Sequence, residues 1–590
     1  LLWAYRAVLA HLQHKPKDEV QARETALSTW KDNPEVDHLI GKKLSQKYRF
    51  AEGEVYQRRA LAFDPKYLPA RLQLCQDLLR LGKEAEGWKL AGQVFEADPY
   101  SVLAHNLATL HDRLNQFTIL IEDGFVVRMD SKEAKIYGPR VLALLKNGKQ
   151  VLGEKYEIEL PQPIYVDIYP RQQDFAIRTF GMPGGAGFLG VCFGQVITMN
   201  SPASQGASPS NWEAVLWHEF CHVVTLSKTK NRMPRWLSEG ISVYEEGQKN
   251  PTWGQPLTLN FRKMILEGEL TPVSQLSAAF LHPKSALHLQ FAYYESSLVV
   301  KYLIDQHGLE ALNHILADLG QGLTINDCLE RHTGSLESLD KEFEAYALSL
   351  ANDLAKEADF TDPEFPPGVN EETVKAYLKE HPNSFPALQQ QVKQLLGDKK
   401  WEEAKAPLQK MYELYPTYIG SDSPLNLLAL VHRELGETKQ ERERLNQVAA
   451  LEDDVLSVYL RLAEIAAEKK DWAAVVEHAN QALAVNPLIK PPHQYLSDAA
   501  EKVGNDSQAI GGLLALAEME PIDVAGLHFR IAELYRRTKK YPEARKQVIR
   551  SLEEAPRYRA AHRLLLTILD EQKQLANASN PSPAVAEKQP

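Results

Sequence analysis

The sequence predicts a multidomain, mostly α-helical α+β protein in which α-solenoid arrays flank a domain with a small mixed sheet. Prolines that end helical segments recur towards both ends of the chain at steps close to 34 residues. Strand-like patterns, in contrast, lie in the middle. A chain of 590 residues is also too long for a single hydrophobic core.

These patterns divide the chain into five segments. We expect helical repeats over residues 1–115, a mixed domain over 116–355, a linker over 356–369, helical repeats over 370–575 and a disordered tail over 576–590. The linker is rich in Asp, Glu and Pro, and the tail is rich in Asn, Ser, Pro and Ala, which are compositions that do not build a packed core.

The repeat signal is the spacing of prolines that follow helical segments. These prolines are Pro34, Pro65 and Pro99, and then Pro382, Pro416, Pro487, Pro521 and Pro556. The step of 71 residues from Pro416 to Pro487 spans two repeats. The six residues ending at Pro65 (ALAFDP) and those ending at Pro487 (ALAVNP) are nearly identical. A helix–turn–helix period of this length ending in Asn/Asp-Pro resembles the tetratricopeptide repeat (TPR), whose helical pairs bury their apolar faces against neighbouring pairs. The resemblance implies surfaces that bind peptides or partner proteins.

The middle segment reads as a sheet followed by helices. Residues 117–122 and 125–129 predict a hairpin that turns at Asp123-Gly124. Residues 132–155 predict a helix, 163–170 and 195–199 predict strands, and the pattern from 210 to about 350 is helical again.

Bulk composition excludes several classes of function. The net charge of −11 is spread along the chain and leaves no basic face, so nucleic acid is not an expected partner. The four cysteines form no CxxC pair, which excludes a cysteine-rich zinc module and a disulfide framework. No apolar stretch is long enough to span a bilayer. The chain begins at Leu1 and not at methionine, which is compatible with a removed leader and leaves the compartment open.

The candidate chemistry lies in the helical segment that contains His218, Glu219 and His222, which form the pattern HExxH. Two histidines four residues apart project from one face of a helix and can bind a single ion, while Glu219 is offset by about 100° and can face a water on that ion. A catalytic zinc site needs a third protein ligand and an open position. The metzincin pattern is excluded, because Thr225 and Lys228 stand where it requires Gly and His.

A glutamate on the following helical segment is the expected third ligand. Residues 236–244, with Glu239 in fourth place, read W-L-S-E-G-I-S-V-Y. This segment resembles the W-L-x-E-G-x-x-x-Y/F segment of gluzincins, close to the peptidase MA-like branch, where that glutamate binds zinc. The resemblance implies one zinc ion per chain, held by His218, His222 and Glu239. Residues 291–308 resemble the helix that carries an oxyanion-stabilising tyrosine, with Tyr294 as the best match and Tyr293 as the alternative.

The implied reaction is zinc-dependent hydrolysis of peptide bonds in a peptide or protein substrate. Zinc lowers the pKa of its water towards ~7, Glu219 takes the proton, and Tyr294 shares the charge that develops on the carbonyl oxygen. The chain has no Gly-x-Met-Glu-Asn-type segment to bind an amino terminus, so we expect an endopeptidase. The alternative is a TPR interaction scaffold whose peptidase-like domain is inactive or binds its metal only structurally.

Two other patterns are interpreted as structural. Residues 185–190 match GxGxxG, but a strand-like segment follows them and not the helix that a dinucleotide site requires, so they predict a glycine-rich loop leading into a cleft-edge strand. Cys221 lies between the two histidines and is expected to pack in the core. No role is assigned to Glu245 or Glu246.

Overall fold

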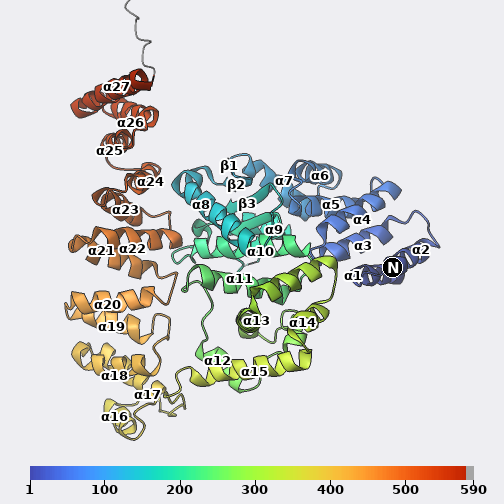
Figure 1. Cartoon of the computed structure of the whole chain (residues 1–590), viewed down its shortest axis with the longest axis horizontal. Coiled ribbons are helices and arrows are strands. Elements are labelled where there is room, and N and C mark those ends of the chain that lie inside the picture. Colours follow the sequence, from blue (N-terminus) through green and yellow to red (C-terminus); the bar gives the residue numbers. More distant parts are fainter. Residues whose placement is uncertain (186, 580–590) are drawn as a thin grey trace, which may run out of the picture. The chain divides into compact units, whose positions relative to one another are not determined.

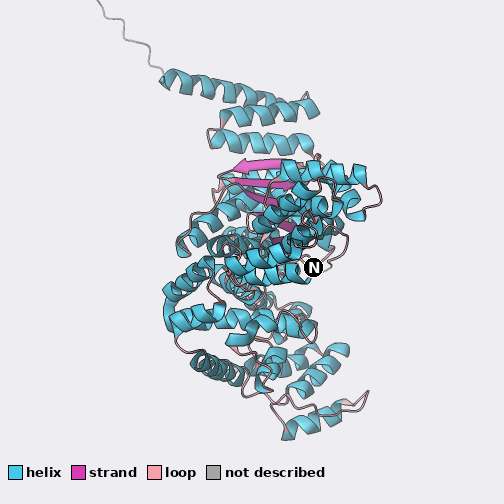
Figure 2. Cartoon of the chain, turned by 90° about the vertical axis from the view of Figure 1, so that its right-hand side faces the viewer, coloured by secondary structure: helices cyan, strands magenta, loops and turns pink. Residues whose placement is uncertain are grey.

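The computed structural model describes residues 1–185 and 187–579, and helices make up most of it (Figures 1 and 2). The chain divides into two compact units. One contains Leu1–Ser131 and Arg140–Asp454, and the other contains Lys132–Pro139 and the chain from Val455 onwards. The expected tail lies outside the described residues from 580 on, whereas 576–579 belong to the last helix, which ends at Ser579.

Helices α1–α7 form an N-terminal array in which each helix packs on the next, and α3 also contacts α1 and α5. Helices α4 and α6 end at Phe63 and Ala97, just before Asp64-Pro65 and Asp98-Pro99, because the residue that precedes a proline is pushed out of the helical region. The bounds of α1–α7 are Leu2–Leu12, Pro16–Leu27, Pro34–Ser45, Phe50–Phe63, Leu68–Arg80, Glu84–Ala97 and Val102–Leu114.

A five-stranded mixed sheet follows the array, with the strand order β1-β2-β3-β5-β4. The predicted hairpin is present, and Asp123 and Gly124 turn it with φ of 51° and 84°, the backbone that a two-residue hairpin loop favours. Strands β2, β3 and β5 run parallel, and β4 pairs antiparallel with β5 at the edge of the sheet. The bounds of β1–β5 are Thr118–Glu122, Phe125–Met129, Ile164–Tyr169, Gly190–Cys192 and Val196–Asn200.

A buried ion cluster joins the N-terminal array to this sheet. Arg128 on β2 donates to Asp167 on β3 (Nε to Oδ1, 2.7 Å) and to Glu84 on α6 (Nη2 to Oε1, 2.6 Å). Arg178 on α9 (Gln172–Phe180) lies 3.2 Å from both carboxylates. Burial alone would raise the pKa of Asp167, but the two guanidinium groups hold it below its ordinary value. The cluster fixes the position of α6 against the sheet.

Helix α10 lies against the sheet and carries the HExxH pattern. It contacts β4 and β5 on one side, and α11 and α13 on the other. Phe220 in the middle of α10 is buried, and its ring centroid lies 5.9 Å from that of Phe125 on β2. The bounds of α8 and α10–α15 are Ser131–Lys155, Trp212–Thr229, Arg235–Lys249, Leu259–Leu266, Ala286–Gln321, Ile325–Thr333 and Leu336–Asp353, with 3₁₀ turns at Pro202–Gln205 and Val273–Ala278.

The C-terminal helices repeat the organisation of the N-terminal array. In the first unit, α16–α20 span Glu371–Glu380, Phe385–Gly397, Trp401–Leu414, Pro424–Glu434 and Thr438–Ala449. In the second unit, α21–α27 span Leu456–Glu468, Trp472–Val485, Lys490–Lys502, Asp506–Ala517, Val524–Arg537, Tyr541–Glu554 and Arg559–Ser579. Within each set, successive helices pack on one another. The predicted fold class, TPR-like helical repeats flanking a domain with a small mixed sheet, is confirmed.

Two expectations from composition also agree with the structure. Among the described residues, no helix is both long and apolar enough to cross a bilayer. All four cysteines are buried and unpaired, and Cys221 packs inside α10 as expected.

Candidate metal centre

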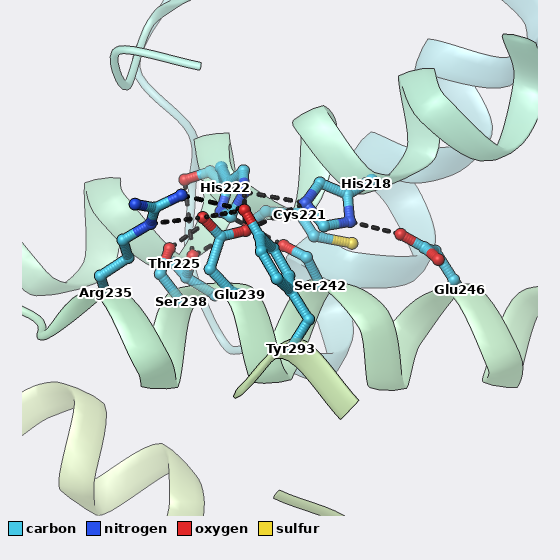
Figure 3. Close-up of polar contacts among 10 residues, drawn as sticks. All are labelled: His218, Cys221, His222, Thr225, Arg235, Ser238, Glu239, Ser242, Glu246 and Tyr293. Carbon is cyan, nitrogen blue, oxygen red and sulfur yellow. Dashed lines mark hydrogen bonds and ion pairs between the residues drawn. The ribbon is translucent and has the colours of Figure 1, made fainter. Parts of the chain in front are cut away.

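Three predicted ligands meet where α10 faces α11. His218 and His222 project from one side of α10 towards Glu239 on α11 (Figure 3). The Asn211 side chain caps α10 by accepting from the backbone amides of Glu213 and Ala214, which fixes where the helix begins. Other side chains of α10, such as Leu216, Phe220 and Val223, are apolar and buried in the core.

The three ligand atoms form a nearly equilateral triangle. The distance from His218 Nε2 to His222 Nε2 is 3.1 Å, and Glu239 Oε2 lies 3.3 Å from the first and 3.4 Å from the second. Two ligand atoms about 2.05 Å from a tetrahedral zinc ion lie about 3.3 Å apart. The triangle therefore has the size that three of the four positions of such an ion require.

Hydrogen bonds at the far side of each ring orient the two imidazoles. Nδ1 of His218 contacts the Glu246 carboxylate, and Nδ1 of His222 contacts the hydroxyls of Ser238 at 2.8 Å and Ser242 at 3.2 Å. With a proton on each Nδ1, both Nε2 lone pairs point into the triangle, as metal-binding histidines require.

The charges around the triangle favour a cation within it. Burial lowers the pKa of His222 and keeps that ring neutral. Burial would likewise lower the pKa of His218, but the charge of Glu246 and a hydrogen bond to Glu239 raise it well above its ordinary value. Burial would raise the pKa of Glu239, but the two neighbouring histidines lower it well below its ordinary value, so Glu239 stays ionised. Two imidazoles and an ionised carboxylate are a donor set that fits a divalent metal ion, and an ion that binds there would displace the extra proton of His218.

Glu219 lies beside the triangle with a free oxygen. It is buried, and its Oε2 has no hydrogen-bond partner among the described residues. Burial, helped by Glu239 and Glu246 and opposed by His218, raises the pKa of Glu219 to about 8. Gly190 at the start of β4 makes room for it, since a Cβ there would come within 2.6 Å of Glu219 Oε1. The last glycine of the GxGxxG pattern is thus a close-approach position, and β4 is the expected cleft-edge strand.

The structure does not bring Tyr294 to the triangle, which corrects the preferred match. Tyr294 is buried and stacks on Phe261, with ring centroids 5.1 Å apart. Tyr293, the alternative, points from α13 towards Glu239 (Figure 3), and its hydroxyl lies 3.4 Å from Glu239 Oε1. Arg235 donates to both, at 2.9 Å to the Tyr293 hydroxyl and 3.1 Å to Glu239. Adjacent helical residues point about 100° apart, so only one can face the triangle.

Comparison with protein families identifies this region. Residues 148–349 match the model of the peptidase MA superfamily. The chain carries a peptidase MA domain. The matched range begins inside α8 and includes α10, α11 and the helix that bears Tyr293, so all the residues of the triangle fall within it.

Comparison with other proteins adds less. No curated protein matches the sequence. YrrB, described as a TPR protein with an unusual peptide-binding site, matches 35% of this chain and 100% of its own at 13% identity, with a TM-score of 0.24. Yeast Tom70 matches 93% of this chain and 97% of its own at 11% identity, with a TM-score of 0.18. Scores this low support no conclusion about arrangement or function.

A cleft of about 1250 Å³ opens over the triangle. Its floor and one wall come from the peptidase MA domain, with Gly190 and Cys192 of β4 beside Glu219 and Tyr293. Its other wall comes from helices α3–α5 of the N-terminal array and the turns between them, including Tyr48 and Arg80. The array is therefore part of the cleft, which the order of segments along the sequence did not indicate.

Sequence reasoning left the supporting residues of the triangle unassigned. These residues are Arg235, Ser242 and Glu246, which lie four before, three after and seven after the ligand Glu239, so they share one face of α11 with it and reach the site. That spacing is the signal that could have assigned Glu246. Glu245, in contrast, points away and accepts from Tyr156 at 2.6 Å.

Proposed function

We propose that the chain is a zinc-dependent peptidase whose single ion is held by His218, His222 and Glu239. The observation that carries the proposal is the triangle of ligand atoms, of tetrahedral size, beside the unpartnered oxygen of Glu219. The peptidase MA match over the same residues supports it. A buried carboxylate oxygen without a partner is unfavourable in a folded protein, and a water held for catalysis would satisfy it.

Each residue of the site has a separate role in the proposed hydrolysis of an amide bond. Zinc, when bound, supplies a Lewis acid and a water of lowered pKa. A cation held by the triangle would lower the pKa of Glu219, so that its ionised carboxylate accepts a proton from the attacking water and later delivers it to the leaving amine. The Tyr293 hydroxyl, held by Arg235, donates to the carbonyl oxygen as negative charge develops there. Glu246 keeps the His218 ring in its ligating tautomer.

The edge strand β4 offers a place for an extended substrate. Val191 is paired with Thr198 of β5, and the neighbouring backbone groups of Gly190 and Cys192 point away from β5 in an antiparallel ladder. Both residues line the cleft beside Glu219. A peptide that adds to this edge would place its main chain across the triangle, which suits cleavage within a chain and supports an endopeptidase. The helical arrays would recruit substrates or partner proteins.

The test is Glu219→Gln in the full-length protein, with Glu213→Gln as the matched control on the same helix. Glu213 pairs with Arg140 at 2.6 Å and lies outside the cleft lining. We expect Glu219→Gln to retain zinc but lose turnover of a casein-type substrate, and we expect Glu213→Gln to keep both. Turnover that persists in Glu219→Gln would end the assignment. A zinc-loaded wild type without hydrolysis of any peptide would favour the scaffold alternative.

A further inference from the structure

The N-terminal array meets the peptidase MA domain through specific contacts beside the cleft. Asn231, just after α10, donates to the carbonyl of Tyr48 at 2.8 Å. The rings of Phe50 and Phe193 meet edge to face with centroids 5.7 Å apart. Arg178 donates to the carbonyl of Leu79 at 3.0 Å. With the ion cluster around Glu84, these contacts make the array wall a fixed part of the cleft.

Arg80 stands out on this wall because it lacks a counter-charge. Its guanidinium carbon lies 5.3 Å from the ring centroids of both Phe50 and Phe193, and its hydrogen bond to the Thr179 carbonyl is long, at 3.4 Å. Among the described residues, no carboxylate lies within ion-pair distance of it. The carboxylate of Asp77, one turn earlier, instead accepts hydrogen bonds from the Ser45 hydroxyl and the Gln73 amide, each at 2.9 Å.

The surroundings of Arg80 favour the binding of an anionic ligand. Burial lowers the pKa of Arg80, so the folded protein holds a guanidinium charge where it is poorly solvated. Burial also raises the pKa of Asp77 to about 7, which weakens the nearest negative charge. A carboxylate brought to Arg80 would form a charge-assisted pair in a partly desolvated site, where such pairs are strong.

Two of the other charged residues of the array wall are also positive. Lys42 and Lys47 line the cleft from α3 and the turn after it, and Asp98 is the acidic residue that the array contributes to the described lining. A protein with a net charge of −11 thus presents a positive wall opposite its candidate metal centre. Tyr48 also lines the cleft from the turn between α3 and α4, and its ring centroid lies 6.0 Å from that of Phe193.

We propose that Arg80 binds a carboxylate of the substrate, so that the cleft selects peptides with an acidic side chain or a free C-terminus beyond the bond to be cleaved. This inference rests on the proposed peptidase function and names the class of substrate. Both sources present the same planar carboxylate, which a guanidinium group can bind through two parallel hydrogen bonds.

Four pools of degenerate decapeptides built from uncharged residues provide the probes. They end in a carboxylate or a carboxamide, and they carry one Glu or one Gln at a degenerate position. Binding to full-length, zinc-supplied Glu219→Gln protein is measured by affinity selection and mass spectrometry. We expect carboxylate-bearing pools to bind roughly 10- to 100-fold tighter than the neutral pool. The pool with Glu and a carboxamide end measures binding of a side-chain carboxylate. The pool with Gln and a carboxylate end measures binding of the C-terminal carboxylate.

Arg80→Gln in the same background should abolish the preference. Arg59→Gln is the matched control, because Arg59 also stacks on an aromatic ring of the array, 4.8 Å from the centroid of Tyr56, but lies outside the cleft. If Arg80→Gln does not fold, the preference itself must still weaken from low salt to about 1 M NaCl, as a charge pair that exchanges with solvent requires.

The outcomes separate the two proposals. Equal binding of all four pools, binding of none, or a preference that survives Arg80→Gln would overturn the role of Arg80. Wild-type protein that binds carboxylate-bearing pools selectively but cleaves none would support Arg80 and contradict the peptidase activity. Cleavage of all pools without preference would support the peptidase activity and contradict the role of Arg80.

Discussion

Substituting Gly190 with alanine should separate turnover from metal binding. The added Cβ would stand 2.6 Å from both Cγ and Oε1 of Glu219, whereas ordinary contacts begin near 3.4 Å. Glu219 or β4 must therefore move by about 0.8 Å. A displacement of this size in a catalytic group lowers turnover by about 100-fold, and the overpacking costs about 1–3 kcal/mol of unfolding free energy. The three metal ligands are untouched, so the zinc content should stay at the wild-type value.

The assay compares kcat on a peptide substrate, zinc content by mass spectrometry and the midpoint of urea unfolding. Gly247→Ala is the control, because it lies on α11 and its Cβ would meet the backbone of Gly254 at an ordinary 3.8 Å. In a Glu219→Gln background, Gly190→Ala should lower the residual rate no further, since both changes act on one group. Unchanged kcat in Gly190→Ala, or loss of zinc with the fold intact, would refute this account of Glu219.

Three further predictions concern the support of His218, the tyrosine that faces Glu239, and the ion cluster around Asp167. Glu246→Gln should weaken zinc affinity by about 10- to 100-fold in a chelator competition, because the ligand His218 loses the carboxylate that orients it; unchanged affinity would remove that role. Tyr293→Phe should lower kcat by about 100- to 1000-fold while Tyr294→Phe leaves it near wild type, and the opposite order would restore the preferred sequence match. Asp167→Asn should cost about 3–5 kcal/mol, because it leaves two buried guanidinium groups short of a partner. Since the pKa of Asp167 is depressed, its contribution is present above about pH 4 and is lost as pH falls through the folded pKa; denaturant titrations from pH 7 to pH 3 should show this loss in wild type and not in Asp167→Asn.

Local sequence rules were sufficient to predict the helical repeats and the hairpin. The α region is disfavoured for a residue that precedes a proline, and the helices before Pro65, Pro99 and Pro487 end where the spacing predicts. The Asp123-Gly124 pair fits the positive φ values of a two-residue turn. In the candidate site, the four-residue spacing of His218 and His222 places both on one helical face.

Features that depend on packing between distant segments could not be predicted in this way. Whether Tyr293 or Tyr294 faces Glu239 is set by the rotation of α13 against α11, and both residues are tyrosine, so composition does not distinguish them. The strand-like pattern after Gly190 breaks at Gly194, where φ of 112° reverses the chain to form the β4–β5 pair. The array wall of the cleft depends on long-range contacts such as Asn231 with Tyr48, which carry no periodic signal.

The most direct test of the central claim is the zinc content of purified full-length protein, measured by mass spectrometry beside His222→Ala. His222 supplies one corner of the ligand triangle, and two remaining protein ligands do not hold zinc as three do. The proposal predicts about one zinc per chain in the wild type and in Glu219→Gln, and little or none in His222→Ala. Equal zinc in His222→Ala and wild type, or none in either after zinc is supplied, would contradict it.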